Sequence, residues 1–330
     1  MARMMKAVWY GENGPAAQVL VHGEMPVPVA AAGEVLVRLH ASGVNPSDVK
    51  ALAGSRPMAF DRVVPHSDGA GVIEAVGEGV DPARIGRRVY LRNGQWRRAN
   101  GTAAQFIALD AGCAHDLPDG VSFETGAALG IPALTAAYAV LKDGPVQGET
   151  ILVHGGGGTV ARLAIQIAVD GGATVIATTG TAERAAFVEQ AGAVAVLDYH
   201  DPDLAAAVIA AAGGNRVTRV IDAEIGTNLA ANIDILAEKG VMVGYGSVLK
   251  PVAELPFLKM MFKNITLSSI LVYLLEADEA ATYAAVIADM LVRGALDVPI
   301  GHVLPLEQAA QSHQLVEGSG RSGAVILAID

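Results

Sequence analysis

The sequence predicts an α/β protein in which a mostly antiparallel β domain precedes a doubly wound, parallel sheet. Alternating apolar runs, divided by turns rich in Gly, Pro, Asn and Asp, fill the first third of the chain. Beyond Ser122, a plausible helix N-cap, strands alternate with helices at the spacing of helical crossovers. The length of 330 residues exceeds that of a typical single domain, so we expect two domains that share a cleft.

The first domain is expected to consist mainly of strands, from residue 6 to about residue 123. Its clearest alternating stretches are residues 34–40, 71–76 and 88–91. The apolar stretch 125–141 that follows is short and is interrupted by Pro132. It therefore predicts a buried helix rather than a membrane span.

The second domain is expected to contain strands joined by helices. Strands are predicted at residues 150–154, 174–178, 195–198, 219–222, 241–245 and 264–267, and helices at 184–191, 204–212 and 230–237. A helix over 278–294 and a strand over 324–329 close the chain, and this strand is expected to return to the first domain. The predicted domain bounds are 1–123, completed by about 268–330, and 124–267.

The net charge argues against nucleic acid as the main partner. The chain carries 23 Lys and Arg against 34 Asp and Glu, a net charge of −11, whereas binding to nucleic acid depends on clustered cations. A local exception surrounds Trp96, and it consists of Arg84, Arg87, Arg88, Arg92, Arg97 and Arg98. This cluster either guides an anionic ligand or forms a solvated loop.

Cysteine usage predicts a cytoplasmic protein. Cys113 is the single cysteine, so the chain has no intramolecular disulfide and no multi-cysteine zinc site. Residues 1–10 lack the apolar core of a signal peptide. We therefore expect a soluble protein with no membrane partner.

The stretch VHGGGGTVARLAIQIAV, residues 153–169, places four glycines between a predicted strand and a predicted helix. Gly155, Gly158 and Ala161 fit the pattern G-x-x-G-x-x-A. Glycines let the backbone approach a pyrophosphate, and the helix that follows presents unpaired N–H groups and the positive end of its dipole. The repeated strand–helix context favours a dinucleotide site over a merely flexible connection.

The end of the second predicted strand of this domain indicates which dinucleotide binds. An NAD site usually has an acidic residue there, but Thr178, Thr179, Gly180 and Thr181 are neutral. Arg184 follows in the first turn of the next helix and is placed to pair with a 2′-phosphate, although a plain surface arginine remains the alternative. The sequence thus favours NADPH.

Several stretches resemble one family, and the resemblance covers the chain nearly end to end. They are residues 42–48 (SGVNPSD), 67–77 (SDGAGVIEAVG), 128–132 (ALGIP), 153–168 and 180–184 (GTAER). The chain resembles the zinc-independent, zeta-crystallin-like quinone oxidoreductases of the medium-chain dehydrogenase/reductase superfamily. The resemblance implies a GroES-like β domain on the substrate side, a Rossmann domain that binds NADPH, and a homodimer.

The resemblance also implies a set of cofactor-binding residues. Arg184 corresponds to a basic residue on the 2′-phosphate, Tyr199 to a tyrosine at the adenosine, and Thr135 to a threonine beside the nicotinamide. The full expected set is Thr135, Gly155, Gly157, Gly158, Thr159, Val160, Thr179, Gly180, Arg184, Tyr199, Gly244, Tyr245, Gly246 and Ser247. The family turn usually reads G-G-V-G, and this chain departs from it at Thr159 and Ala161.

Three residues of the stretch NPSDVK are expected to be catalytic. Asn45 matches the family's cleft asparagine, and Lys50 stands where many quinone reductases have a tyrosine. The stretch is similar to N-P-x-D-x-K of enone and alkenal reductases, in which the lysine donates to the substrate carbonyl or the nicotinamide ribose. The alternative for Lys50 is a solvated lysine, and Asp48 either orients Lys50 or caps the local helix.

No zinc is expected. Zinc-dependent relatives have Cys where this chain has Asn45 and His-Glu where it has Ser67-Asp68. His66 is one position away from the ligand position and stands alone, and a lone histidine is more often structural because three protein ligands are normally required.

The expected function is therefore NADPH-dependent reduction of quinones or α,β-unsaturated carbonyls. Two alternatives are a dedicated biosynthetic enoyl reductase and an NADPH-binding sensor or structural protein with little turnover. His40 and Tyr245 are possible proton donors, with core roles favoured for both. The apolar stretch 265–275 either supplies a dimer contact at a sheet edge or lies in the interior.

Overall fold

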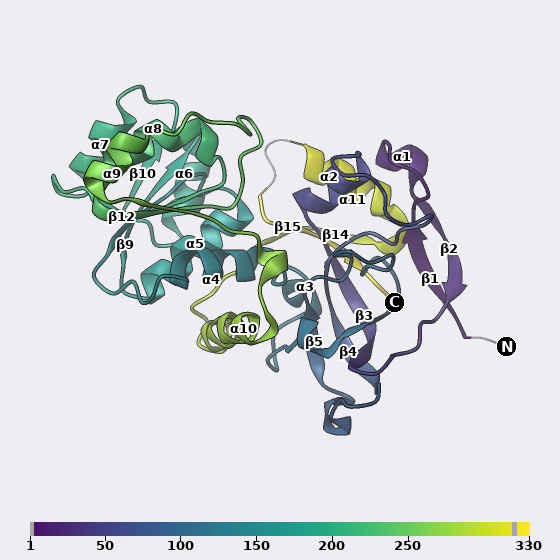
Figure 1. The fold of residues 1–330 in the computed structure, drawn as a ribbon. Helices are drawn as coiled ribbons and strands as arrows, with labels where there is room; N and C mark the ends of the chain where they lie inside the picture. The colour runs from purple at the N-terminus through teal and green to yellow at the C-terminus, as the bar shows by residue number, and fades with distance from the viewer. Residues whose placement is uncertain (1–2, 319–321) are drawn as a thin grey trace. The chain divides into compact units, whose positions relative to one another are not determined.

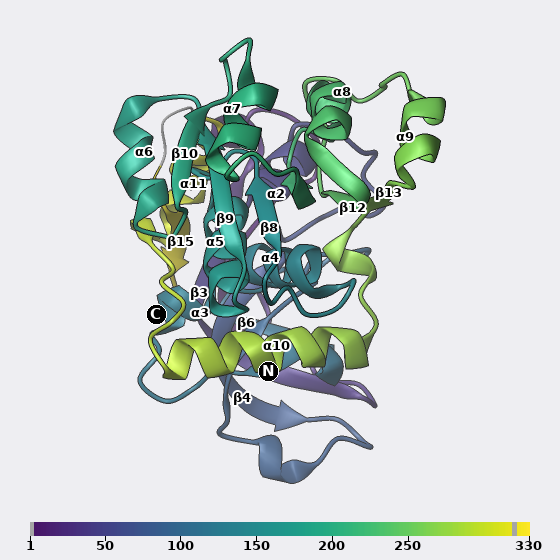
Figure 2. The ribbon, with the colours of Figure 1, turned by 90° about the vertical axis from the view of Figure 1, so that its left-hand side faces the viewer.

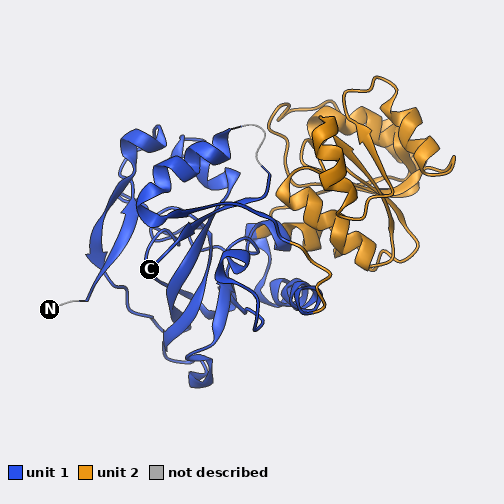
Figure 3. Cartoon of the chain, turned by 180° about the vertical axis from the view of Figure 1, so that it is seen from behind, with its two compact units in different colours: residues 1–134, 273–292, 298–330 blue, residues 135–272, 293–297 orange. Residues whose placement is uncertain are grey.

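The computed structural model describes residues 3–318 and 322–330, and the chain divides into two compact units (Figure 3). The first unit comprises Met1–Leu134, Tyr273–Val292 and Val298–Asp330, and the second comprises Thr135–Val272 and Arg293–Asp297. Within the described parts of the chain, every helix is too short or too polar to cross a membrane.

The first unit is built on a seven-stranded sheet and a separate hairpin. The sheet order is β14-β15-β3-β4-β5-β7, with β6 also paired to β3, and the hairpin joins β1 to β2. The strands are β1 (Met4–Trp9), β2 (Val21–Pro26), β3 (Glu34–Val44), β4 (Asp68–Val76), β5 (Arg88–Leu91), β6 (Phe106–Asp110), β7 (Ala114–Asp116), β14 (Ile300–Pro305) and β15 (Ala324–Ala328). All pairs except β14–β15 are antiparallel.

The last strand of the chain, β15, pairs with β3 through Val325 and Val44, as the sequence predicts. Both faces of β3 and β6 contribute to the core, because the consecutive residues Val35, Leu36 and Val37 are buried in one apolar cluster together with Ile107. Strand β3 pairs with β4 and β6 at once, with two register shifts along its pairing with β4.

Short helices connect the strands of the first unit (Figure 1). They are α1 (Ala16–Val19), α2 (Pro46–Leu52), α3 (Phe123–Gly126), α10 (Ala277–Val292) and α11 (Ala309–Glu317), with 3₁₀ turns at Pro82–Arg84, Ala111–Cys113 and Leu306–Gln308. Ser122 caps α3, because its hydroxyl accepts from the Thr125 N–H at 3.1 Å. The stretch 125–141 forms two helices rather than one: α3 ends at Gly126, and α4 (Pro132–Leu141) starts at Pro132, which fits the first helical turn.

The second unit holds a six-stranded parallel sheet in the order β10-β9-β8-β11-β12-β13. Its strands are β8 (Thr150–Val153), β9 (Thr174–Thr179), β10 (Ala195–Asp198), β11 (Val217–Asp222), β12 (Leu236–Gly244) and β13 (Thr266–Ser269). Its helices are α5 (Thr159–Asp170), α6 (Ala182–Glu189), α7 (Leu204–Ala211), α8 (Ile225–Ile235) and α9 (Phe257–Lys263), and a 3₁₀ turn at Val272–Leu274 spans the chain boundary between the two units. Helices α5 and α6 contact β8, β9 and β10, whereas α8 and α9 contact β12 (Figures 1 and 2).

This part of the chain differs from the prediction at one strand boundary in particular and in one helix. Strand β12 begins at Leu236 rather than at 241, because a register irregularity lets Leu236 pair with Val217 ahead of the regular pairing. Lys239 has a left-handed backbone (φ 61°) at this irregularity. Helix α9 was not predicted, and it ends where Asn264 adopts the left-handed conformation (φ 51°) that terminates helices.

Candidate active site

The glycine turn lies where the sequence predicts it, between β8 and α5. Gly155 has a positive φ of 67°, which favours glycine, and its carbonyl accepts from the Gly158 N–H at 2.9 Å. Gly158 is the N-cap of α5 and has extended backbone angles. The first N–H groups of α5, at Thr159 and Val160, therefore have no partner within the helix, which is the arrangement that binds a phosphate.

Arg184 lies against this turn. A Cβ added to Gly157 would come within 3.0 Å of the Arg184 side-chain Cδ, so the guanidinium stem covers the glycine backbone. On the neighbouring strand, Thr178 and Thr179 are buried at the end of β9 and carry no charge. The structure thus brings a cation, and no carboxylate from this strand end, to the glycine turn.

A cavity of about 480 Å³ opens at the carboxyl ends of the parallel strands. Its lining contains the predicted Gly155 and Tyr199, and the complete lining is His154, Gly155, Thr178, Tyr199, His200, Asp222, Ala223, Glu224, Thr227, Asn228 and Leu249. Sequence reasoning did not select His154, Asp222 or Glu224. Their signal was weak but present, since each follows or ends a predicted parallel strand.

A buried polar chain supports this cavity. The Asp222 carboxylate accepts from Asn232 Nδ2 at 2.9 Å and from Asn228 Nδ2 at 3.1 Å. Asn232 Oδ1 lies 2.8 Å from His154 Nε2, and His154 Nδ1 lies 3.2 Å from the Thr178 hydroxyl. Because Asn232 uses its amino group on Asp222, its oxygen accepts, and the His154 proton is therefore on Nε2. The network fixes the wall of the cavity.

The predicted loop after β12 packs against the residues that line the cavity. The Tyr245 N–H donates to the Asp222 carbonyl at 3.0 Å, and the Ile225 N–H donates to the Gly246 carbonyl at 3.2 Å. The Ser247 hydroxyl accepts from the Gly226 N–H at 3.0 Å. Burial, and secondarily the Asp222 carboxylate, raises the pKa of Tyr245, which makes this phenol a weaker proton donor.

Most of the predicted cofactor residues lie outside that cavity lining, which holds only Gly155 and Tyr199 of the set. Gly244 ends β12, where a Cβ would come within 3.0 Å of the Ile225 side chain. Thr135 is buried on α4. The lining of the cavity thus includes part of the predicted set, and the loop 244–247 reaches it through residues 222–226.

In the first unit, helix α2 organises the predicted catalytic residues. Asp48 Oδ2 accepts from the Asn45 N–H at 2.8 Å, which is the capping-box contact that fixes the start of the helix. Asp48 therefore caps α2, which is one of the two roles that the sequence left open for it. Lys50 stands two positions later, on a different side of the helix, and its side chain is exposed.

Asn45 connects the helix to a second buried carboxyl. Its Nδ2 donates to Asp68 Oδ2 at 2.8 Å, and the Ile131 N–H donates to the same oxygen at 2.9 Å. Burial raises the pKa of Asp48 to about 7 and raises that of Asp68 well above its usual range. The carboxyls of Asp48 and Asp68 thus hold protons to higher pH than exposed aspartates.

Two separate stretches of the chain match two protein-family models. Residues 31–119 match the alcohol dehydrogenase GroES-like domain, and residues 159–289 match the zinc-binding dehydrogenase family. Human quinone oxidoreductase is 30% identical over 330 residues, with 98% of each chain covered. The chain belongs to the quinone oxidoreductase family.

Solved structures of quinone oxidoreductases extend this likeness. A mycobacterial quinone oxidoreductase is 31% identical, with a TM-score of 0.91 over 98% of this chain and 100% of that chain. The Escherichia coli quinone oxidoreductase complexed with NADPH is 26% identical, with a TM-score of 0.87 over 98% of this chain and 100% of that chain. The α/β fold with a GroES-like domain and a Rossmann-type parallel sheet is therefore the fold of this family.

The described residues of this chain do not fit the zinc ion for which one of the matching families is named. Throughout residues 3–318 and 322–330, no group of three or more His, Cys, Asp or Glu side chains is arranged to hold a metal. His66, which the sequence left alone, is in fact paired: its Nε2 lies 2.9 Å from His313 Nε2 and its Nδ1 lies 3.0 Å from the Ser42 hydroxyl. Its expected structural role agrees with complete burial of both rings.

His40 also has a packing contact. Its ring stacks on Phe123 with the ring centroids 4.5 Å apart. Burial, and then the nearby Arg38, lowers the pKa of His40, so this imidazole is a poor proton donor at neutral pH.

Proposed function

We propose that this protein is an NADPH-dependent quinone oxidoreductase. The observation that carries the proposal is the contact between Arg184 and the glycine turn, in a chain of the quinone oxidoreductase family whose β9 strand ends without a carboxylate. The turn around Gly155 and the N-terminus of α5 would hold the pyrophosphate. Arg184 would pair with the 2′-phosphate, and Tyr199 would cover the adenosine.

NADPH, when bound, supplies a hydride to an electrophilic acceptor. We assign Thr135 and the loop 244–247 to the nicotinamide end of the cofactor. The Rossmann domain, residues 124–267, is thus the cofactor domain, and the GroES-like domain, residues 1–123 completed by about 268–330, binds the acceptor.

Asn45 and Lys50 are proposed to stabilise the acceptor oxygen. As the acceptor is reduced, negative charge develops on that oxygen, and an exposed ammonium such as that of Lys50 stabilises it. The amide of Asn45 is held in place by Asp68, so it is oriented before the acceptor binds. The same chemistry serves an α,β-unsaturated carbonyl, and we propose enones as a second acceptor class because the stretch NPSDVK carries a lysine.

We propose that neither acceptor class needs zinc, because the described residues offer no ligand set for it. The test is NADPH oxidation, followed by absorbance, with one simple quinone and one short enone in buffer that contains EDTA. Turnover with NADPH preferred over NADH supports the proposal. NADPH binding without turnover of either acceptor contradicts it and favours a dedicated enoyl reductase or a non-catalytic NADPH-binding protein, and loss of activity on EDTA addition contradicts zinc independence.

A homodimer is proposed through the edge of the parallel sheet. Strand β13 is the last strand in the sheet order, and a long exposed edge invites pairing with another chain. Large apolar side chains are exposed on α9 and β13, namely Phe257, Leu258, Met261, Phe262 and Leu267. Light scattering should give twice the chain mass for the wild type and a smaller mass for Leu267→Lys; a monomeric wild type contradicts the proposal.

The single cysteine, Cys113, suits a reducing compartment, so we place the reaction in the cytoplasm. The test is fractionation of cells that express the tagged chain, with the tag and quinone-dependent NADPH oxidation measured in each fraction. Recovery of the chain outside the cytoplasmic fraction contradicts this placement.

A further inference from the structure

A second cavity lies entirely within the first unit, beside the C-terminal end of α2. Its volume is about 250 Å³. The lining is Tyr10, Ala51, Arg56, Pro57, Met58, Ala59, Phe60, Val63, Gln95, Trp96 and Arg97. Ala51 directly follows Lys50, so this cavity adjoins the helix turn that carries the proposed catalytic lysine.

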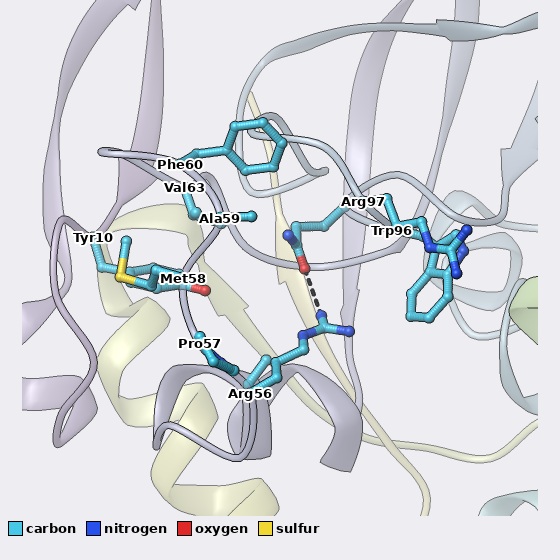
Figure 4. Close-up of a pocket in the computed structure, with 11 residues that line it drawn as sticks. Tyr10, Arg56, Pro57, Met58, Ala59, Phe60, Val63, Trp96 and Arg97 are labelled. Atoms are coloured by element: carbon cyan, nitrogen blue, oxygen red, sulfur yellow. Dashed lines mark hydrogen bonds between the residues drawn. The ribbon is translucent and has the colours of Figure 1, made fainter.

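The walls of this cavity suit a flat ring. In Figure 4, Tyr10 and Met58 lie on one side, Trp96 on the opposite side and Phe60 between them at the rim. The volume exceeds the roughly 150 Å³ of an apolar cavity that holds one benzene. Aromatic side chains and a thioether bind flat, polarisable rings well.

Two guanidinium groups lie near the Trp96 ring of this cavity. The Arg97 guanidinium lies 5.1 Å from the centre of the Trp96 ring, and that of Arg56 lies 5.6 Å from it. The cavity lining includes no Asp or Glu. Two cations are therefore held close to the same ring in a protein whose net charge is −11.

Neither guanidinium is neutralised by an ion pair within the described residues. Arg56 Nη2 donates instead to the neutral Gln95 Oε1 at 2.9 Å, a contact drawn in Figure 4. The Asp48 carboxyl interacts electrostatically with Arg56, but it is buried and already accepts from the Asn45 N–H. Both guanidiniums thus retain donors for an anion.

The loop that carries Arg97 is held in one conformation. Gln95 Nε2 donates to the Arg98 carbonyl at 3.0 Å, and Asn93 Nδ2 donates to the Tyr273 carbonyl at 3.1 Å. The Trp96 ring stacks on the Tyr273 ring with the centroids 4.5 Å apart. Arg97 itself has a left-handed φ of 56°. A loop fixed in this way loses little entropy on binding a ligand.

We propose that this cavity selects acceptors in which a flat ring bears an anionic group, a carboxylate or a sulfonate, which Arg56 and Arg97 bind. The inference rests on the proposed reductase function and adds a charge preference to it. The ring lies among Tyr10, Phe60 and Trp96, and the anion receives charge-assisted hydrogen bonds from the two guanidiniums. Neutral quinones are also reduced, without this preference.

The test compares two quinones that differ in one charge. The ratio of kcat/KM for a naphthoquinone with a sulfonate on its benzo ring to that for unsubstituted naphthoquinone is measured at saturating NADPH. Comparing this ratio between variants removes the intrinsic reactivity of each quinone. Arg56→Gln and Arg97→Gln are each expected to lower the ratio about tenfold, through KM for the sulfonate. The matched control is Arg62→Gln, an exposed arginine of the same loop outside the lining, which should change the ratio less than about twofold.

Arg97→Lys keeps a positive charge and should retain most of the preference for the sulfonate. The difference in the kcat/KM ratio between the wild type and each Gln variant should also shrink as the salt concentration is raised, because exposed charges are screened. The proposal is overturned if Arg56→Gln and Arg97→Gln each lower kcat/KM equally for the charged and the neutral quinone. It is also overturned if the kcat/KM ratio of the wild type does not change with salt.

A binding measurement separates this inference from the proposed function. Isothermal titration calorimetry of the full chain with naphthalene sulfonate needs no turnover, and naphthol serves as the neutral counterpart. Weaker sulfonate binding in Arg97→Gln, with naphthol unaffected, supports the anion site even if no quinone is reduced. Equal binding of sulfonate and naphthol to the wild type refutes the site, even if quinones are reduced well.

Discussion

Tyr199 lies directly against Gly180, so closely that a Cβ at residue 180 would overlap the Tyr199 hydroxyl and ring. The backbone of Gly180 is not in the left-handed region, so the absence of a side chain serves this contact rather than a turn. Gly180, which follows β9, and Tyr199, which follows β10, thus form one surface beside the glycine turn.

Gly180→Ala should weaken NADPH binding. The added methyl displaces the exposed Tyr199 ring from the adenosine position, and a loss of about three- to tenfold in affinity is expected for a displaced aromatic contact. NADPH fluorescence titration measures it, and thermal unfolding checks that the fold is kept. In a Tyr199→Ala background the same substitution should have no further effect, because the clash is gone. Additive losses in the double variant would show that Gly180 acts independently of Tyr199.

Arg184→Gln should change the choice of cofactor. We expect NADPH affinity to fall about tenfold or more and NADH affinity to stay constant, because only NADPH carries the 2′-phosphate. Titration of both nucleotides gives the ratio. Arg216→Gln, an exposed arginine of the same unit, is the matched control. Parallel losses for NADPH and NADH would assign Arg184 to packing on Gly157 instead.

Lys50→Ala should abolish most reduction while leaving NADPH binding intact. Loss of one charge that stabilises a developing oxyanion is expected to lower kcat/KM about a hundredfold. Lys50→Arg should recover part of the rate, and Lys6→Ala, an exposed lysine of the same unit, should leave it unchanged. A rate within about twofold of the wild type in Lys50→Ala would identify Lys50 as a solvated lysine.

The cofactor turn was predictable from sequence because its signals are local. A strand, four glycines and a helix follow one another, and Arg184 falls one helix later, so periodicity and spacing locate them. The hydrogen-bond network behind the cofactor cavity was not predictable in the same way. Asp222, Asn232 and His154 come from three separate elements, and only the parallel order of β8 and β11 places them together.

The same limit applies to the first unit. His66 looked isolated because its partner, His313, lies on the helix α11 near the other end of the chain. The capping contact of Asp48 is likewise visible only as a distance, since capping and orienting a lysine require the same residue at the same spacing. The charged cavity was partly visible as an arginine cluster around Trp96, but its second cation, Arg56, comes from another loop.

Buried carboxyls and imidazoles give the fold opposing dependences on pH. Burial lowers the pKa of His313 from 6.5 to about 4. As the pH falls below 6.5, the imidazole is therefore protonated in the unfolded chain but stays neutral in the folded chain, and the folded state loses stability. Burial raises the pKa of Asp48 from 3.8 to about 7, so as pH rises through this range the unfolded chain loses a proton that the folded chain keeps, and stability also drops. Because the histidine effect is complete above pH 6.5, the decline above that pH belongs to the carboxyls.

Asp48→Asn should therefore reduce the loss of stability that accompanies a rise in pH. An asparagine oxygen still accepts from the Asn45 N–H, so the helix cap is retained while the titration is removed. Asp48 should make the wild type lose stability progressively between about pH 4 and about pH 7, by on the order of a few kcal/mol in all, and the histidines do not offset the part of this loss above about pH 6.5. Urea unfolding across this range gives the slope for each variant. Equal slopes in wild type and Asp48→Asn would mean that Asp48 is already ionised in the folded protein, and that the buried cap is made by a carboxylate.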